Sequence, residues 1–466
     1  MNPFNAHFKN INGEDTYPLD EIIYRSKIDN SLLEVHHDRE ALASRSPEEW
    51  KKLFAERRMS FKPADMSGIW SKREMVLPEI PEEDIVTMQE GFSPLFDASR
   101  LAKELGIRKL HVKLCGNSHT GSFKDLGMTV LVSQVNHILK KGKHPIDAVA
   151  CASTGDTSAA LSAYCAKAGI PSIVFLPAGK TSTAQLIQPI SNGSIVLALD
   201  TDFDGCMKIV QQVTADNRIY LANSMNSLRV EGQKTISPEI CQQLNWNVPD
   251  TIIIPGGNLG NVSALAKGFD DCLAMGLINK KPRIIVAQAA NANPFYQAYT
   301  RGFDKLEPVQ AKKTLASAIQ IGNPVSYPKA ERAIKNYNGV VVEVSEQELA
   351  DAAHRADKIG LYCCPHTGVA LGALEKLVAD KTISSDEEVV VISTAHGLKF
   401  TEFKVAYHEG SLEGLTSRYA NPIFKAPAEL GAVMDILKRA GYAYVLLNRD
   451  VLGDYYRKHG FTKAQN

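Results

Sequence analysis

One lysine lies in a segment whose sequence could make it reactive. The run GNSHTGSFKDLGMT (residues 116–129) follows an apolar segment and leads into an amphipathic stretch, so Lys124 is expected at the start of a helix. The positive end of the helix dipole disfavours an ammonium there, which lowers the pKa of the lysine and favours its use as a nucleophile and base. A single lysine is usually a surface residue, so this interpretation depends on the surrounding segments.

Two further segments have the composition of ligand-binding loops. ASTGDTSAA (152–160) places hydroxyls and amides at an expected helix start, where they suit a carboxylate but also serve as ordinary helix caps. PGGNLGN (255–261) opens another helix, and its amides can form a nest for a phosphate. It has neither the GxGxxG spacing of a dinucleotide site nor the Lys-Ser or Lys-Thr of a P-loop. A reactive lysine, a carboxylate cradle and a phosphate nest are what a pyridoxal-phosphate (PLP) site for amino acids requires.

The elements that must position these loops can be predicted from apolar periodicity. From about residue 105, short apolar runs rich in β-branched residues alternate with amphipathic stretches, which is typical of βα units around a parallel sheet. The predicted strands cover 110–114, 147–153, 172–177, 194–199, 219–223, 251–256, 283–289 and 388–394. The candidate loops follow such strands, and the carboxyl ends of parallel strands border a ligand crevice.

Length and composition exclude several classes of function. A chain of 466 residues predicts at least two lobes. Fifty-two basic and 52 acidic residues leave no net charge to attract nucleic acid or an anionic membrane, so a small-molecule partner is favoured. The eight cysteines are scattered without a CxxC pair, and His119, His366 and His396 lack metal-ligand spacing, so no metal is predicted. The opening residues lack the apolar core of a signal peptide and no run is long enough to span a membrane, so a cytoplasmic protein is expected.

Five longer runs resemble the threonine synthase family in its plant-type branch. They are CGNSHTGSFKDLGMTVLVSQVN, CASTGDTSAALSAYCAKAGIPSIVFLPA, LANSMNSLRVEGQKT, IIIPGGNLGN and STAHGLKF, and the similarity extends over about residues 15–440. The resemblance implies an α/β fold of fold-type II PLP enzymes, similar to the tryptophan synthase β subunit, with two open twisted sheet lobes and PLP between them. The implied division is an N-terminal arm (1–90), a large lobe (91–127 plus 228–440), a small lobe (128–227) and a C-terminal extension (441–466).

The resemblance also implies a role for each site residue. Lys124 matches the lysine that forms the Schiff base with PLP. The loop for the cofactor phosphate matches Gly256, Gly257, Asn258, Leu259, Gly260 and Asn261, and the group that bonds the pyridine nitrogen matches Thr394. The loop for the substrate carboxylate matches Ser153, Thr154, Gly155 and Thr157, and the contacts to the substrate phosphate match Asn223, Ser224 and Arg229.

Asp156 departs from the pattern, because many fold-type II enzymes place Asn beside the phenolic oxygen of the cofactor. An aspartate cannot donate a hydrogen bond unless it is protonated, and it could instead only cap its helix.

The implied reaction converts O-phospho-L-homoserine and water to L-threonine and phosphate. A homodimer is expected from the resemblance. Trp70, in SGIWSKREMVLPEI (67–80), lies in the region where S-adenosylmethionine activates the plant branch, although the indole could equally anchor the arm to the sheet domain.

Two other functions remain open from sequence alone. A serine or threonine dehydratase would share the lysine and the glycine loop but needs no second phosphate site, and Arg229 with Asn223 and Ser224 disfavours it. A non-catalytic regulatory protein on the same scaffold would not need Lys124, which is intact.

Overall fold

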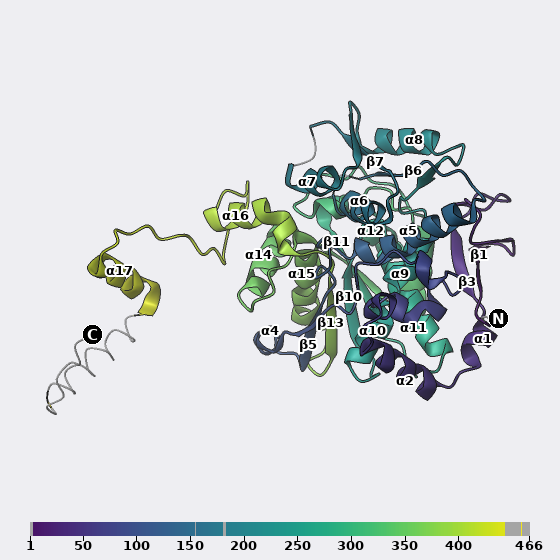
Figure 1. The fold of residues 1–466 in the computed structure, drawn as a ribbon. Helices are drawn as coiled ribbons and strands as arrows, with labels where there is room; N and C mark the ends of the chain where they lie inside the picture. The colour runs from purple at the N-terminus through teal and green to yellow at the C-terminus, as the bar shows by residue number, and fades with distance from the viewer. Residues whose placement is uncertain (1–2, 154, 180–182, 443–457, 459–466) are drawn as a thin grey trace. The chain divides into compact units, whose positions relative to one another are not determined.

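A computed structural model describes residues 3–153, 155–179, 183–442 and 458 of the chain (Figure 1). The chain divides into two compact units, Met1–Tyr419 and Ala420–Asn466. The three sheets all lie in the first unit. In the second unit the described residues form helix α17 (Leu430–Leu437) and a π-helical turn over Lys438–Tyr442. No helix among the described residues is long and apolar enough to cross a membrane.

The larger sheet has six strands in the order β12-β11-β10-β13-β5-β4. All neighbours are parallel except β4, which runs antiparallel to β5 at one edge. The strands are β4 (Leu95–Asp97), β5 (Lys109–Leu114), β10 (Thr251–Pro255), β11 (Arg283–Ala289), β12 (Val340–Val344) and β13 (Glu388–Ser393). Strand β10 is apolar on both faces because helices cover both: Ile252 and Ile254 belong to one hydrophobic core and Ile253 to another.

The smaller sheet has four parallel strands in the order β8-β7-β6-β9. They are β6 (Ala148–Ala152), β7 (Ser172–Pro177), β8 (Ile195–Leu199) and β9 (Ile219–Leu221). Helices α5 (Lys124–Lys141), α6 (Asp156–Ala168), α7 (Thr183–Ser191) and α8 (Phe203–Val213) accompany this sheet (Figure 1).

The remaining helices of the first unit surround the larger sheet or belong to the N-terminal arm. They are α1 (Arg39–Ala43), α2 (Pro47–Arg58), α3 (Pro63–Met66), α4 (Ser99–Leu105), α9 (Leu228–Gln233), α10 (Ile236–Gln243), α11 (Gly260–Ala274), α12 (Pro294–Thr300), α13 (Tyr327–Asn336), α14 (Glu346–Asp357), α15 (Pro365–Ala379) and α16 (Thr401–Glu409). Short 3-10 turns include η1 (Trp70–Met75) and η5 (Gly397–Phe400).

The N-terminal arm forms a small antiparallel sheet and packs into the main core. Its strands are β1 (Ala6–Asn10), β2 (Thr16–Tyr17) and β3 (Leu33–His37). Trp50 and Trp70 are fully buried in the same core as Met128 and Val130 of α5. The indole Nε1 of Trp70 donates to Thr129 Oγ1 at 2.8 Å, which favours the anchoring interpretation of this residue.

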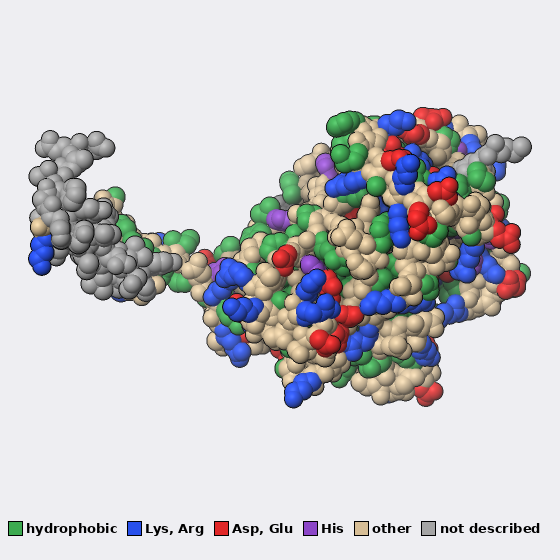
Figure 2. Space-filling model, turned by 90° about the horizontal axis from the view of Figure 1, so that it is seen from below, with side chains coloured by type: hydrophobic (Ala, Val, Ile, Leu, Met, Phe, Trp, Pro, Cys, Tyr) green, Lys and Arg blue, Asp and Glu red, His purple; other side chains and the backbone are tan. Residues whose placement is uncertain are grey.

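The predicted α/β fold with two sheets is confirmed. Each of the eight predicted strands is present, with ends that differ by at most two residues. The sequence patterns did not single out β4, β12 or the three arm strands. Figure 2 shows basic and acidic side chains interspersed over one face of the first unit, in agreement with the neutral net charge.

Candidate active site

One cavity gathers the loops at the carboxyl ends of strands from both larger sheets. Most of its lining residues follow β5, β6, β9, β10 or β13, whereas Ala318 and Ile319 follow β11 and His366 follows β12. The lining residues are Phe123, Lys124, Asp156, Ser224, Arg229, Val230, Gln233, Pro255, Gly257, Asn258, Leu259, Gly260, Asn261, Ala318, Ile319, His366 and Thr394. The structure therefore brings together residues that are up to 271 positions apart in the sequence, as expected for parallel strands whose carboxyl ends share an edge.

Lys124 is the first residue of helix α5, as predicted. Burial is the main cause that lowers the pKa of Lys124 to about 7; the nearby guanidinium of Arg229 lowers it further, and Asp156 opposes the shift. The ammonium end also lies 4.3 Å from the centre of the Phe123 ring. Desolvation and a like charge are therefore the causes of the lowered pKa, in the direction expected from sequence, and near neutral pH a large fraction of this amine is unprotonated and nucleophilic.

The segment before Lys124 is held against the segment after β13. Phe123 N donates to Thr394 O at 2.9 Å, and His396 N donates to Gly121 O at 2.9 Å. Thr394 directly follows β13, is only 6% exposed, and lines the cavity. These backbone bonds fix the start of α5 and the threonine hydroxyl relative to one another.

The glycine-rich loop turns sharply between β10 and α11. Leu259 adopts a left-handed conformation with φ 65°, and Asn261 Nδ2 donates to Pro255 O at 2.7 Å to close the turn. A Cβ on Gly257 would lie 2.9 Å from Ile319 Cα, and one on Gly256 would lie 2.6 Å from Val286 Cγ1, so neither position has room for a side chain. The loop ends at the N-terminus of α11, where free amides suit an anion. Gly256 lies behind the loop and is the one member of 256–261 that does not line the cavity.

Arg229 is a buried guanidinium that lines the same cavity, with a residue exposure of 4%. Its Nη1 donates to Ala222 O at 3.2 Å and its Nη2 donates to Thr157 Oγ1 at 3.4 Å, while Nε is buried without a hydrogen-bond partner. Burial lowers the pKa of Arg229 to about 10, so the group stays charged at neutral pH. Within the described ranges it forms no ion pair: Glu231, the nearest acidic residue along the helix, instead pairs with Lys234, Lys267 and His37.

The remaining predicted substrate contacts divide between the cavity and its supports. Ser224 lines the cavity. Asn223 uses both ends of its amide on the backbone of Ala152, accepting from N at 2.9 Å and donating to O at 3.0 Å, so it joins the ends of β9 and β6.

In the loop before α6, the Ser153 hydroxyl accepts from Gly155 N and Ser158 N, which caps that helix. Thr157 contacts Arg229 rather than lining the cavity. Thr154 lies outside the described residues.

Asp156 is the first residue of α6 and faces the cavity with 8% exposure. Burial would raise the pKa of Asp156, but the ammonium of Lys399, at 3.1 Å, together with His366 and Lys124, holds it below its usual value. Asp156 therefore stays ionised at neutral pH. The predicted alternative, in which Asp156 only caps its helix, is not supported, because Ser153 Oγ caps this end of α6 and the carboxylate of Asp156 pairs with Lys399.

Three polar residues of this region were not predicted from the sequence. His366 lines the cavity, and its Nε2 accepts from Ala318 N at 3.0 Å. Gln233 lines the cavity one turn beyond Arg229. Lys399 forms an ion pair with Asp156 but does not itself line the cavity. His366 was expected to be structural, and Lys399 lies in the STAHGLKF run, from which only Thr394 was assigned a role.

Comparison with known proteins agrees with this geometry. Residues 86–395 match the family described as "Pyridoxal-phosphate dependent enzyme". The chain is 56% identical over 438 residues to threonine synthase 2, chloroplastic, of Arabidopsis thaliana, covering 94% of this chain and 84% of that protein. It is 41% identical over 385 residues to the threonine synthase of Methanocaldococcus jannaschii, covering 82% and 90%. The chain belongs to the threonine synthase family.

Solved structures of lower identity share the fold of this threonine synthase family member. The threonine synthase of Escherichia coli superposes with a TM-score of 0.66 at 20% identity, covering 93% of this chain and 100% of that one. Maize serine racemase superposes with a TM-score of 0.56 at 19% identity, covering 68% and 93%. These likenesses extend the fold to racemases, so the fold alone does not select the reaction.

The residues present fit the cofactor that this threonine synthase family uses, pyridoxal phosphate. A nucleophilic lysine with a pKa of about 7 lies in one cavity with a glycine loop whose amides can take a phosphate. Gly257 lines the cavity and has no room for a Cβ, so the loop presents backbone there. Thr394 supplies a neutral hydroxyl in the same cavity.

Proposed function

We propose that this protein catalyses the conversion of O-phospho-L-homoserine and water to L-threonine and phosphate. Arg229 is the observation that carries the proposal. It is a buried, charged guanidinium with an unused Nε that shares a cavity with Lys124, and within the described residues no carboxylate neutralises it. Leaving such a charge unpaired is costly unless a ligand supplies the opposite charge. The glycine loop already serves the cofactor phosphate, so a second anion, the γ-phosphate of the substrate, suits Arg229.

The chain's own side chains account for the other tasks of the reaction. Pyridoxal phosphate, when bound, supplies the electron sink. Lys124, with a pKa of about 7, is the amine that would take the proton from Cα. After it has passed that proton on, the same amine would take a proton from Cβ as the phosphate leaves Cγ. A proton returned to Cγ, the addition of water at Cβ and the return of a proton to Cα would then complete threonine. Ser224 and Arg229 hold the departing phosphate, and the buried walls around them limit the water that reaches the site. The hydroxyl of Thr394 bonds the pyridine nitrogen without fully protonating it.

Substitution of Arg229 tests the proposal. Arg229→Ala should lower kcat/KM for phosphohomoserine by about 10-fold to 100-fold, because a charge-assisted contact of this kind contributes about 1.5 to 3 kcal/mol. Arg229→Lys should rescue only part of the loss, since a point charge cannot reproduce the planar fork. The content of bound cofactor should not change.

A matched control separates substrate binding from stability. Arg283 pairs with Glu387 at 3.0 Å at the opposite end of the sheet, so Arg283→Ala should affect melting and leave kcat/KM unaltered. The same preparations are offered L-serine and L-threonine. If Arg229→Ala treats phosphohomoserine normally, or if the native chain releases ammonia from serine and not phosphate from phosphohomoserine, the dehydratase assignment replaces this one.

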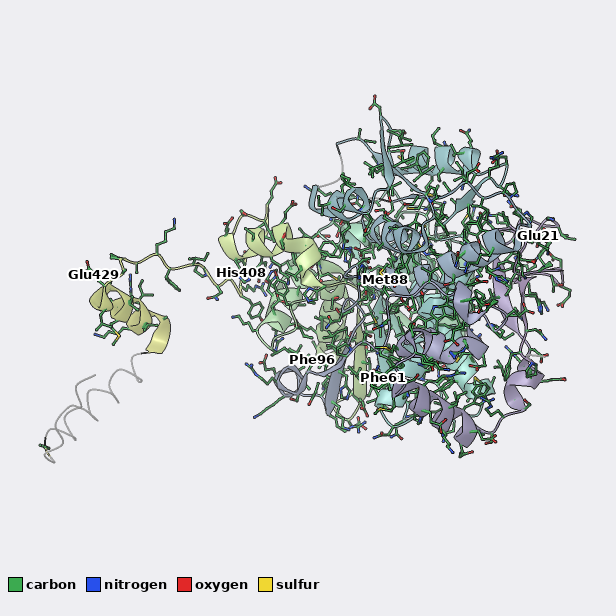
Figure 3. The ribbon with its side chains drawn as sticks, viewed as in Figure 1. Glu21, Phe61, Met88, Phe96, His408 and Glu429 are labelled. Atoms are coloured by element: carbon green, nitrogen blue, oxygen red, sulfur yellow. The ribbon has the colours of Figure 1, made fainter. Side chains whose placement is uncertain are left out.

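We further propose that the protein is a homodimer and works in the cytoplasm. Exposed apolar side chains on the arm support an interface: Met59 is 80% exposed and Phe61, labelled in Figure 3, is 92% exposed. Sedimentation of Phe61→Asp against the native chain tests the dimer. A fluorescent fusion of the full-length protein tests the compartment, and because the Arabidopsis relative is named as chloroplastic, a plastid signal would overturn the cytoplasmic assignment.

Activation by S-adenosylmethionine also stays a proposal, which rests on the resemblance of the segment around Trp70. Trp70 is fully buried and bonded to Thr129, so a ligand there would have to act on the neighbouring arm rather than displace the indole. The activator should raise the rate of the native chain. Calorimetry that detects no binding at millimolar ligand would end the proposal.

A further inference from the structure

Lys399 is a buried cation just outside the cavity. It belongs to the 3-10 turn η5, after β13 of the larger sheet, and its side chain is 13% exposed. Its Nζ lies 3.1 Å from Asp156 Oδ1 and donates to Thr120 O at 2.9 Å and to Gln188 Oε1 at 3.0 Å. Asp156 and Gln188 begin or lie in helices beside the smaller sheet, and Thr120 precedes Lys124. One ammonium therefore joins three segments that border the site.

The aliphatic part of the Lys399 side chain packs closely against the loop that precedes the reactive lysine. Gly121 has φ +78°, and a Cβ there would lie 3.0 Å from Lys399 Cδ and 3.2 Å from Cγ. The turn thus needs glycine for its backbone conformation and for the close approach of this side chain. Lys399 is held in place from its backbone to its Nζ.

The negative charge of Asp156 would be unfavourable beside an anionic ligand, and Lys399 compensates that charge. Asp156 lines the cavity beside Lys124 and His366, and an ionised carboxylate there would repel an anionic oxygen of a bound ligand. A neutral amide would avoid the repulsion, but this chain has Asp. The ion pair makes Asp156 and Lys399 together a neutral unit, with the negative member toward the cavity and the positive member behind it.

We propose that Lys399 is a positioning residue of the active site that acts through Asp156. The ion pair of the two residues takes the place of a single neutral side chain beside the cofactor ring. The proposal rests on the proposed function only in assuming that the cavity holds pyridoxal phosphate, and not on the identity of the substrate. Lys399 itself does not line the cavity.

The visible absorbance of the lysine-bound cofactor reports the proposal without turnover. The absorbance changes with pH as a proton leaves the nitrogen of Lys124, and a nearby negative charge raises the midpoint whereas a positive charge lowers it. Lys399→Gln should raise the midpoint by about one pH unit, and Asp156→Asn should lower it by a similar amount. The double variant Asp156→Asn with Lys399→Gln should return to within about half a unit of the native value, because both charges are gone.

A control pair exists in the next helix. Lys404 Nζ lies 2.5 Å from Asp357 Oδ2, with side-chain exposures of 5% and 14%, and neither residue lines the cavity. Lys404→Gln should lower the melting temperature without moving the absorbance midpoint. If Lys399→Gln behaves as Lys404→Gln does, or if both single variants move the midpoint in one direction, Lys399 is only structural and the proposal is wrong.

Two further measurements keep the test decisive. If Lys399→Gln does not fold, Lys399→Arg preserves the charge and should keep the native midpoint, and an Lys399→Arg midpoint that moves as far as that of Asp156→Asn overturns the proposal. Threonine formation by the native chain is measured separately. A chain that binds the cofactor and makes no threonine refutes the proposed function, while the absorbance titration still decides the role of Lys399.

Discussion

Lys124 combines a position at a helix start with a pKa near neutrality, and both properties can be tested on the side chain itself. Lys124→Ala removes the nucleophile and the base together, so turnover should fall by several orders of magnitude while the fold survives. Borohydride followed by mass spectrometry should label the native chain at this residue and leave the variant unlabelled. Activity above about a tenth of native would contradict the assignment, since acid–base catalysis alone contributes about 100-fold or more.

The pKa of about 7 predicts a specific pH dependence for Lys124. In the cofactor-free protein, its rate of reaction with an amine-specific reagent should rise as pH increases through about 7, because only the neutral amine is nucleophilic. Exposed lysines should react with a midpoint near 10.4. Because Arg229 lowers the pKa of Lys124, Arg229→Met should move the midpoint upward, and peptide-level mass spectrometry measures both. A midpoint above 9 in the native chain would exclude desolvation as the activating cause.

At the scale of elements, the turn between β10 and α11 depends on glycine where the backbone meets Ile319. Gly257→Ala would place a Cβ 2.9 Å from Ile319 Cα, so the loop must shift. Its amide N–H groups would then no longer point toward the cofactor phosphate. We expect at least a tenfold weaker affinity for pyridoxal phosphate, measured by fluorescence titration, which corresponds to about 1.4 kcal/mol. Gly431→Ala, in open space on α17, is the control and should bind normally.

A hydrogen bond from the indole of Trp70 to the hydroxyl of Thr129 attaches the arm to α5. Trp70→Phe keeps most of the apolar contact but removes the donor to Thr129 Oγ1, so unfolding should require about 1 to 2 kcal/mol less free energy. Urea denaturation followed by circular dichroism measures the change. Ile28→Ala, at a position 79% exposed and away from the proposed interface, should lie within about 0.5 kcal/mol of native. Equal losses in the two variants would mean that Trp70 is not the anchor.

The same elements show why part of the site could be predicted from sequence and part could not. The interior strands of the two larger sheets, such as β6 and β10, are apolar runs because helices cover both faces, and the three loops that were predicted to bind ligands carry visible Gly, Ser and Lys patterns. Lys399 and His366 carry no such pattern. Their positions depend on how α15, before β13, and η5, after β13, pack against the larger sheet, which is a tertiary arrangement that local periodicity does not encode. The arm strands are short and half-polar, so their periodicity is weak.

Across the whole molecule, a buried charge cluster joins the arm to the large sheet and predicts acid sensitivity. Glu231 contacts His37 at 2.8 Å and pairs with Lys234 and Lys267. Burial, with the charge of Lys234 next, lowers the pKa of His37 to about 4, so the folded state keeps it neutral. The unfolded chain binds a proton below about 6.5 and the folded chain does not, so stability falls as pH decreases from about 6.5 to 4.

The expected loss from His37 is about 3 kcal/mol over that range, and Glu231 adds to it below about pH 4.3, because its lowered pKa stabilises only the ionised form. Denaturant titrations at pH 7.5, 6 and 5 measure the slope. His37→Gln should reduce the slope between pH 6.5 and 4 without abolishing it, because burial also lowers the pKa of His354, to about 3. His119→Gln, an exposed control, should retain the native slope. A flat native profile would contradict the burial of a neutral His37.

Strand β3 forms hydrogen bonds with residues that are synthesised much later than the arm. The arm can therefore complete its native contacts only late in synthesis. The carbonyl of Leu33 accepts from Ser227 Oγ at 2.5 Å and from Lys329 Nζ at 2.7 Å, and Arg332 donates to the carbonyl of Ile11 at 2.8 Å. These partners emerge from the ribosome some 200 to 320 residues after the arm does. At about 5 to 20 residues per second, Leu33 and Ile11 wait from about ten seconds to about a minute for these partners. Residues 1–90 are therefore among the last to complete their native contacts, and we expect chaperones to bind the nascent chain during that interval.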